Sequence, residues 1–393
     1  MRTRAAFLIS TAIVLTGLTV PMAAQADTTT SHSNAAAVRS AEGLVPPQLA
    51  RFGANGKLWV PPAGLGTRTV EVPPRWAAIE AAIRFGADIV LVRPGTLPPG
   101  HGAESSDDGI LQNINPGKPV LVRPRDAWGS VTGSGTIASG DSQGYAFVNL
   151  TNISIVGFDF RNQVINIRNS HDFTMARFTF GLLNVIANGG SGSRNISLVE
   201  GVSPVLTSTD VDRIAVRTAN YRNITNLVFN GIYAAPPAKG RFSDAHNDTL
   251  QTSSTGGRIN GLTIANSILF QASSQVFQCS NVTGLVIINS ALVGGLRASE
   301  RFPLPPDRYV PTGENTLWGD SRGTVVAYSY ILGSINSDHH FSRVVNTVTG
   351  TRPSQPGFTV DPSFADPDTP QTAWLDSVSP VPTDAYLKAI WTW

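Results

Sequence analysis

Cysteine is nearly absent from this chain of 393 residues, since Cys279 is the only one. A single thiol excludes an internal disulfide framework and a cysteine-rich zinc site. Charged residues make up only 14% of the sequence, with 29 basic against 27 acidic, so the chain lacks the basic footprint of a nucleic-acid-binding protein. After residue 22 no segment is apolar over the length that a membrane-spanning helix needs. Stability must therefore come from an apolar core.

The first residues have the layout of a secretory signal peptide. Two arginines precede an apolar stretch from Ala5 to Met22, and the small-residue site Ala24-Gln-Ala26 follows it. Ser, Thr, Gly and Pro interrupt the stretch, which makes it a poor membrane anchor. We expect residues 1–26 to be removed and the chain to be secreted, into the periplasm or the extracellular space, with no stable membrane insertion afterwards.

A short apolar unit with few charges recurs along the middle of the chain. Such a repeat at intervals of ~20–40 residues is typical of a solenoid, because each turn needs its neighbours to bury its apolar side chains. Strands follow one another without helical spacers, which favours stacked parallel coils; an antiparallel sandwich is the alternative, but its hairpins would be more evenly spaced. The unit occurs at residues 153–160, 173–180, 227–233, 262–270, 285–293 and 325–332.

The two ends of the chain differ from this repeat. Residues 27–74 are rich in Ala, Ser, Pro and Gly and predict a linker and N-terminal wrap. At residues 75–85 the apolar spacing is helical and a glycine follows, which predicts a short helix that caps the open end of the solenoid. We assign the solenoid to residues 75–350 and a C-terminal strap to residues 351–393.

Three segments resemble a known family. These are the predicted helix followed by Val90-Leu-Val-Arg-Pro-Gly, the Asn-Ser-Ile-Leu-Phe unit at 266–270, and Asp361-Pro-Ser-Phe. Over about residues 75–370 they resemble the pectate lyase-like superfamily. The resemblance implies an all-β fold, a single-stranded right-handed parallel β-helix with a short N-terminal capping helix. It does not decide the reaction, because that superfamily contains lyases, hydrolases, epimerases and non-catalytic surface proteins.

Strand alternation predicts a row of outward side chains on one face of the solenoid. We align the coils by their last inward residues, Ile167, Val216, Leu250, Phe277 and Leu317. The next position then gives a row of arginine, amide and indole groups, which suit the carboxylates, hydroxyls and apolar faces of sugars. The predicted substrate-binding residues are Arg168, Arg213, Asn247, Gln251, Gln278, Glu314, Trp318 and Asp320, with Arg217 in the same row between Arg168 and Gln251.

The segment Asp244-Ala-His246-Asn-Asp248 offers two carboxylates and an imidazole at one bend. In one interpretation His246 accepts a proton while Asp244 and Asp248 orient it or bind Ca²⁺ through oxygen. In the other, these side chains only cap the bend by hydrogen bonding to backbone amides. The predicted catalytic residues are His246, Arg217, Asp248 and Asp244, with Asp244 and Asp248 as calcium ligands and no organic cofactor.

These residues predict an enzyme that degrades a polysaccharide, most simply a lyase that cleaves a uronate-containing chain by β-elimination. Related lyases use lysine or arginine as the base, but none of the four lysines, Lys57, Lys118, Lys239 and Lys388, falls on the row. One alternative is an inverting hydrolase built on Asp248, Glu314 and Asp320. The other is a non-catalytic carbohydrate-binding solenoid. In each case we expect a monomer whose partner is a polysaccharide.

Overall fold

The computed structural model describes residues 51–99, 110–134, 144–205, 207–208, 210–240, 242–303 and 315–393. The predicted signal peptide, residues 1–26, and the first part of the predicted linker lie outside these residues. In the described part of the chain, no helix combines the length and apolar character needed to cross a membrane.

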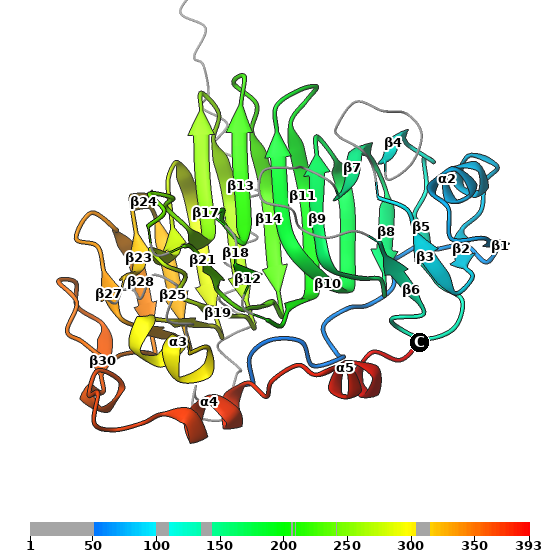
Figure 1. Ribbon diagram of the computed structural model, residues 1–393. Helices are drawn as coiled ribbons and strands as arrows, with labels where there is room; N and C mark the ends of the chain where they lie inside the picture. Colours follow the sequence, from blue (N-terminus) through cyan, green and yellow to red (C-terminus); the bar gives the residue numbers. More distant parts are fainter. Residues whose placement is uncertain are drawn as a thin grey trace, which may run out of the picture.

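The described chain is mostly β-structure, and its strands pair in parallel with those of the next coil. One hydrogen-bonded network joins 28 strands, and Figure 1 shows them stacked side by side along a solenoid. Every strand pair of the described residues is parallel. Examples are the pair of β13 Ile214–Ala219 with β17 Asp248–Thr255 and the pair of β18 Ile259–Ala265 with β21 Val282–Ile288. A parallel solenoid is therefore present, and the antiparallel sandwich is excluded.

Each coil contributes to three stacks of strands, which we call the first, second and third faces. The first face is the one on which the predicted row lies. Its strands are β4 Ile110–Ile114, β7 Gly144–Leu150, the ends of β9 Asp159–Arg168 and β10 His171–Ala187, β13 Ile214–Ala219, β17 Asp248–Thr255, β20 Gln275–Gln278, β23 Asn315–Trp318 and β27 Ser334–Ile335.

The second face follows the first face in each coil. Its strands are β1 Thr69–Val72, β2 Ile89–Val92, β5 Val120–Pro124, β8 Ile153–Val156, the start of β10, β11 Ser193–Ser203, β14 Ile224–Asn230, β18 Ile259–Ala265, β21 Val282–Ile288, β24 Ser321–Arg322, β25 Thr324–Ala327 and β28 Phe341–Val345.

The third face closes each coil. Its strands are β3 Gly95–Leu97, β6 Val131–Gly133, the start of β9, the middle of β10, the end of β11, β15 Tyr233–Ala234, β19 Ile268–Phe270, β22 Ala291–Val293, β26 Tyr330–Leu332, β29 Thr347–Thr349 and β30 Phe358–Val360. A separate pair joins β12 Thr207–Ser208 to β16 Pro237–Ala238. Strand pairing thus begins at β1 and ends at β30, beyond the predicted limits of 75 and 350, because these short end strands lack the apolar unit.

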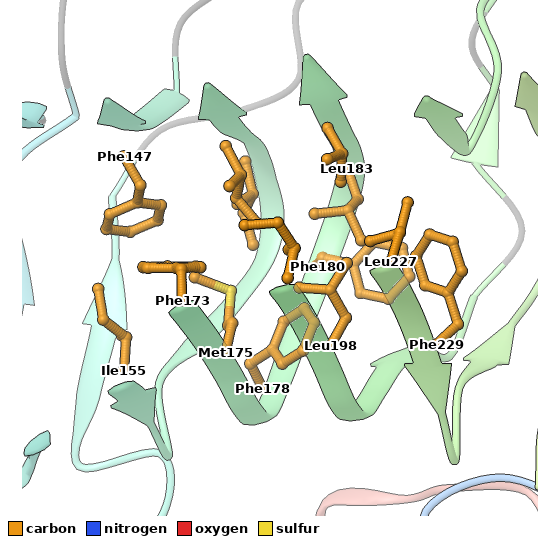
Figure 2. Close-up of a cluster of buried hydrophobic side chains, with 14 of the residues drawn as sticks. Phe147, Ile155, Phe173, Met175, Phe178, Phe180, Leu183, Leu198, Leu227 and Phe229 are labelled. Carbon is orange, nitrogen blue, oxygen red and sulfur yellow. The ribbon is translucent and has the colours of Figure 1, made fainter. Parts of the chain in front are cut away.

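The core lies between the three faces and consists of equivalent side chains stacked coil upon coil. Figure 2 shows part of it, where Phe147 and Phe173 lie near Met175 and Phe178. The rings of Phe147 and Phe173 are 5.8 Å apart. A cavity at one level of such a stack removes contacts in the coils on both sides, so each level stabilises its neighbours.

The helix expected over 75–85 is present as α2 Trp76–Arg84 and lies at one end of the solenoid (Figure 1). Its buried face is apolar, and Trp76 packs against Tyr145 and Phe147 at ring distances of 5.7 and 5.5 Å. Gly86 ends it with a positive φ of 85°. The helix covers core side chains that an open end would expose.

The C-terminal residues run back along the third face towards the first coils (Figure 1). They contain three short helical segments. Leu375, Val378 and Leu387 are buried against outward apolar residues of that face, and Trp391 packs on Trp128 at 5.1 Å. The segments are η2 Pro362–Phe364, α4 Thr372–Val378 and α5 Asp384–Ile390, while α3 Gly295–Arg301 lies between β22 and β23.

The N-terminal segment covers part of the second face in the same way. Leu58, Trp59 and Leu65 pack against a small outward apolar cluster there. Among the described residues, the strap and this segment therefore pack against the third face and part of the second, and neither packs on the first.

Asparagine ladders hold the turns in register. Asn266 and Asn289 both have positive φ, a conformation that asparagine tolerates better than most residues. Asn266 donates to Asn230 Oδ1 at 2.8 Å, and Asn289 donates to Asn266 Oδ1 at 2.6 Å. Stacked amides therefore link successive coils outside the strands.

Candidate functional site

The predicted row of polar side chains exists on the first face for three of its members, while Arg168 and Arg217 lie in a different row. Leu250 pairs with Phe277, and Phe277 pairs with Leu317, so Gln251, Gln278 and Trp318 follow one another in consecutive coils. The amide of Gln251 donates to Gln278 Oε1 at 3.0 Å. This part of the row is confirmed.

The prediction that Arg217 precedes Gln251 in this row is wrong. Ile214, not Val216, pairs with Leu250, so Ala215 lies beside Gln251 and Arg217 lies beside Ser253. A shift of two residues leaves the inward and outward pattern unchanged, which is why alternation alone could not detect it. Arg168 lies in the row of Arg217, separated from it by Ile186 of the intervening coil.

The corrected register brings together two carboxylates, Asp212 and Asp248. The backbone N–H of Asp248 donates to Asp212 Oδ1 at 3.0 Å. Asp212 was not among the site residues predicted from the sequence. The sequence does contain a signal for it, because Asp212 precedes Ile214 by two residues as Asp248 precedes Leu250. Aligning Val216 instead of Ile214 with Leu250 concealed this signal.

Asp248 is completely buried, and donors surround its carboxyl group. Its Oδ1 accepts the backbone N–H of Gln275 at 3.1 Å, and its Oδ2 accepts the side-chain amide of Gln251 at 3.2 Å. His246 Nδ1 lies 3.4 Å from the same Oδ2. The aspartate therefore connects the exposed imidazole to the amide row.

Burial and the neighbouring charge of Asp212 raise the pKa of Asp248 to about 8, although the bonds from Gln251 and Gln275 oppose the shift. Burial also raises the pKa of Asp212, against the bond from the Asp248 backbone and the charges of Arg217 and His246. Near neutral pH the Asp248 carboxyl group is therefore protonated, whereas an isolated aspartate is ionised.

Two groups of this cluster reach solvent. The side chains of His246 and Arg217 are each 52% exposed, whereas those of Asp248 and Asp212 are 0% and 7% exposed. Arg217 extends towards Asp212, with its guanidinium nitrogen 3.7 Å from Oδ2. A ligand on the first face would contact His246 and Arg217, while the two carboxyl groups would act through them.

Two predicted substrate-binding residues are buried, and for both the prediction is wrong. Arg213 is 0% exposed, and its guanidinium donates to the backbone carbonyl groups of Gly181, Val205, Ala235 and Pro236. Burial lowers the pKa of Arg213 to about 9. Asn247 is also fully buried, and its amide donates to the carbonyl of Val211 at 3.4 Å.

The other predicted residues occupy different positions. Arg168 lies two coils from Arg217, and its buried Nε has no hydrogen-bond partner among the described residues. Asp320 is exposed, beyond Trp318, and Glu314 lies outside the described residues. Arg168 and Asp320 are not part of the cluster around Asp248.

The donor set expected for calcium does not fit at this bend. Asp244 is exposed, and within the described chain its carboxylate makes no ion pair or hydrogen bond. The described residues contain no group of three or more His, Cys, Asp or Glu side chains arranged to hold a metal ion. Ca²⁺ takes six to eight oxygen ligands, so Asp244 and Asp248 do not make a site for it.

An open depression with a volume of about 540 Å³ lies at the far end of the row. Gln278, Trp318, Asp320, Arg322 and His340 are among its lining residues. The Trp318 side chain is 42% exposed there, as an aromatic surface suited to a sugar ring. The row therefore leads from His246 and Asp248 into a depression two coils away.

Glycine at position 319 allows this close approach of the coils. Gly319 has a φ of 89°, and a Cβ atom there would lie 2.0 Å from the carbonyl oxygen of Cys279. The backbone N–H of Cys279 donates to the carbonyl of Trp318 at 2.8 Å. Any larger residue at this turn would displace Trp318 from the row.

No protein-family model matches the sequence, and no curated protein matches it. Some solved structures resemble it, but only weakly. ORF18 of Geobacillus virus E2 is 11% identical, with 72% of this chain and 58% of that chain covered and a TM-score of 0.38. The catalytic domain of a GH87 alpha-1,3-glucanase in complex with nigerose is 12% identical, with 76% and 56% covered and a TM-score of 0.36.

The alginate lyase AlyF-OU02, solved with G6, is 12% identical, with 75% of this chain and 66% of that chain covered and a TM-score of 0.31. This chain spans somewhat more than half the length of the viral protein and the glucanase domain. With identities this low and TM-scores below 0.4, the activities of these proteins are not transferred to this one. The likeness to the pectate lyase-like superfamily stays a prediction.

Proposed function

We propose that the protein is a polysaccharide lyase that cleaves a uronate-containing chain by β-elimination. The observation that carries this proposal is the pairing of exposed His246 and Arg217 with buried Asp248 and Asp212. It supplies a base and a cation where a polymer can contact them, and it keeps the carboxyl groups away from the substrate.

In this proposal His246 Nε2 removes the proton from the carbon next to the uronate carboxylate. The electron pair of that bond forms a new carbon–carbon double bond, and the bond to the glycosidic oxygen breaks. The leaving oxygen takes up a proton, which the imidazolium formed in the first step can return. Arg217 neutralises the charge that develops on the uronate carboxylate, which lowers the barrier to proton removal.

Asp248 acts as a positioning residue by setting the tautomer of His246. When the carboxyl group is ionised, Nδ1–H faces Oδ2 and Nε2 is free to accept a proton. When it is protonated, its O–H faces Nδ1, and the ring proton then occupies Nε2. The base is therefore active only above the pKa of Asp248.

The row Gln251, Gln278 and Trp318 would bind the polymer. Its coils are ~4.8 Å apart, a spacing close to the length of one sugar residue in a chain. Two amides for hydroxyl groups and one indole for a ring face then meet successive sugars. This extended and mostly polar surface suits a long polymer better than a small molecule.

An inverting hydrolase on Asp248, Glu314 and Asp320 is the second candidate. The raised pKa of Asp248 favours it, because a protonated carboxyl group can serve as a general acid. Its complete burial opposes it, because the group would have to touch the glycosidic oxygen. A non-catalytic binding solenoid would use the same row without turnover.

The test is ultraviolet absorbance of the unsaturated uronate product, measured with the protein and its His246→Ala variant on polygalacturonate and alginate. We expect absorbance to rise with the protein and not with the variant, while both unfold at the same temperature. A variant with unchanged turnover would remove His246 from the mechanism.

We further propose that the protein is secreted, that it acts as a monomer, and that its coils wind right-handed. Connections between parallel strands of one sheet are right-handed in nearly all proteins. A calcium requirement stays a prediction from the sequence, and no step above uses the ion. Turnover with and without chelator tests the calcium requirement, and the mass and elution volume of the exported protein test the first two proposals.

A further inference from the structure

A second, smaller depression lies where the first face turns into the second face. Its volume is about 210 Å³, and Arg258, Asn281, Thr283, Asp320 and Arg322 line it. All five residues are exposed. Asp320 and Arg322 also line the depression beside Trp318, so the two hollows adjoin each other.

The register places these residues in three consecutive coils. Arg258 lies just before β18, and the backbone N–H of Ile259 donates to the carbonyl of Asn281 in the next coil at 3.1 Å. Thr283 pairs with Arg322 in the coil after that. The two arginines are therefore anchored two coil spacings and two strand positions apart, about 12 Å, with the amide and hydroxyl groups between them.

Four polar side chains around this hollow make no hydrogen bond or ion pair within the described residues. Neither Arg258 nor Arg322 forms an ion pair or a side-chain hydrogen bond there, and the same holds for the side chains of Asn281 and Thr283. Arg84, which is also exposed, instead pairs with Glu80 at 2.7 Å. Unpaired donors that converge on one hollow are the arrangement that an anionic group requires.

We propose that Arg258 and Arg322 form a subsite that binds the carboxylate of a uronate residue remote from the bond that is cleaved. This inference rests on the proposed function, because it takes the polymer to run from His246 along Gln251, Gln278 and Trp318. Two arginines and one aspartate leave one net positive charge, which matches a single carboxylate. Only chains long enough to reach from His246 past Trp318 gain this contact.

The experiment compares the full-length exported protein with its Arg258→Gln and Arg322→Gln variants, singly and together. The control is Arg194→Gln, because Arg194 is exposed and belongs to the same row of the second face as Thr283 and Arg322. Binding is measured by calorimetry with polygalacturonate, with alginate, and with the same polymers after their carboxylates are reduced to alcohols. Thermal melting confirms that each variant is folded.

We expect the double variant to bind an acidic polymer roughly tenfold more weakly, with binding of the reduced polymers unchanged and the control unaffected. Turnover of the shortest cleaved oligosaccharide should stay the same, while KM for the polymer rises. Equal affinities of protein and double variant, or a wild-type protein that binds neither acidic polymer, would overturn the subsite. If the wild-type protein shows no lyase turnover but the double variant still binds the acidic polymers more weakly, the subsite is retained and the proposed function is wrong.

Discussion

The raised pKa of Asp248 predicts how lyase activity depends on pH. Because His246 is a base only when Asp248 is ionised, kcat/KM should rise with pH and level off above about 8. The substrate carboxylates are ionised throughout this range, so the rising limb of the pH profile reports a group of the enzyme. On this limb, below about pH 8, kcat/KM should fall about tenfold per pH unit.

The charge of Asp212 sets part of that value. Two unit charges one coil spacing apart, ~4.8 Å, repel each other by about 3 kcal/mol at an effective dielectric constant of ~20. Replacing Asp212 by Asn removes this charge and can keep the oxygen that accepts the Asp248 N–H. The limb should then move towards acid by up to ~2 pH units.

The assay is the initial rate of ultraviolet absorbance at low substrate concentration from pH 5 to 10, for the protein and for Asp212→Asn. Asp248→Asn should lower kcat at least about 100-fold at pH 8 and above, because the neutral amide, like the protonated carboxyl group, does not hold Nε2 of His246 free to accept a proton. A limb near pH 8 that stays in place in Asp212→Asn would refute this account of the pair. So would a wild-type limb below pH 6.

Three further predictions concern stability and binding. The pKa of Asp248 is higher in the folded chain than in the unfolded one, so its stabilising effect is complete below pH 3.8 and is lost as pH rises through about 8. In urea titrations Asp248→Asn should therefore have a larger free energy of unfolding than the wild type above pH 8. An equal or smaller free energy of unfolding there would contradict the raised pKa. Leu250→Ala should lower the free energy of unfolding by about 2–5 kcal/mol, because Leu250 is 1% exposed and stacked between Ile214 and Phe277, and a loss below 1 kcal/mol would argue against a tight stack. Trp318→Ala should raise KM for the polymer at unchanged kcat and melting temperature, and an unchanged KM would place the polymer elsewhere.

The sequence was sufficient to predict the parallel coils, because their evidence is a repeat of apolar residues. The units at 153–160 and 285–293 appear as strands of the second face and third face that stack in register with their neighbours. The helix at α2 was predictable for the same reason, since its spacing is helical and a glycine ends it. The helices α4 and α5 were not predicted, because their apolar residues are selected by contact with the third face and not by a long periodic pattern.

The site could be predicted only in part, because its geometry depends on the register between coils. Gln251, Gln278 and Trp318 were placed together because the same offset from Leu250, Phe277 and Leu317 holds in each coil. The loop before β13 has a different length, and the two-residue slip that it allows preserves the pattern of inward residues. A sequence pattern therefore cannot place Arg217 or reveal Asp212.

Burial was the second property that the sequence could not supply. Arginine is a residue type that binds acidic sugars, yet the guanidinium of Arg213 donates hydrogen bonds to four backbone carbonyls of neighbouring turns. Those carbonyls come from residues 181, 205, 235 and 236, which no local motif connects to it. A polar residue in an irregular loop can be structural or functional, and only the path of the surrounding backbone decides which.

The most direct test of the proposed function is to count two products of the same reaction, new double bonds by ultraviolet absorbance and new reducing ends by chemical titration, on a panel of uronate polysaccharides. Each β-elimination creates one of each, so the proposal predicts equal numbers from the first minutes onward. Reducing ends without double bonds would show a hydrolase, and the absence of both on every polymer of the panel would contradict catalysis at this site.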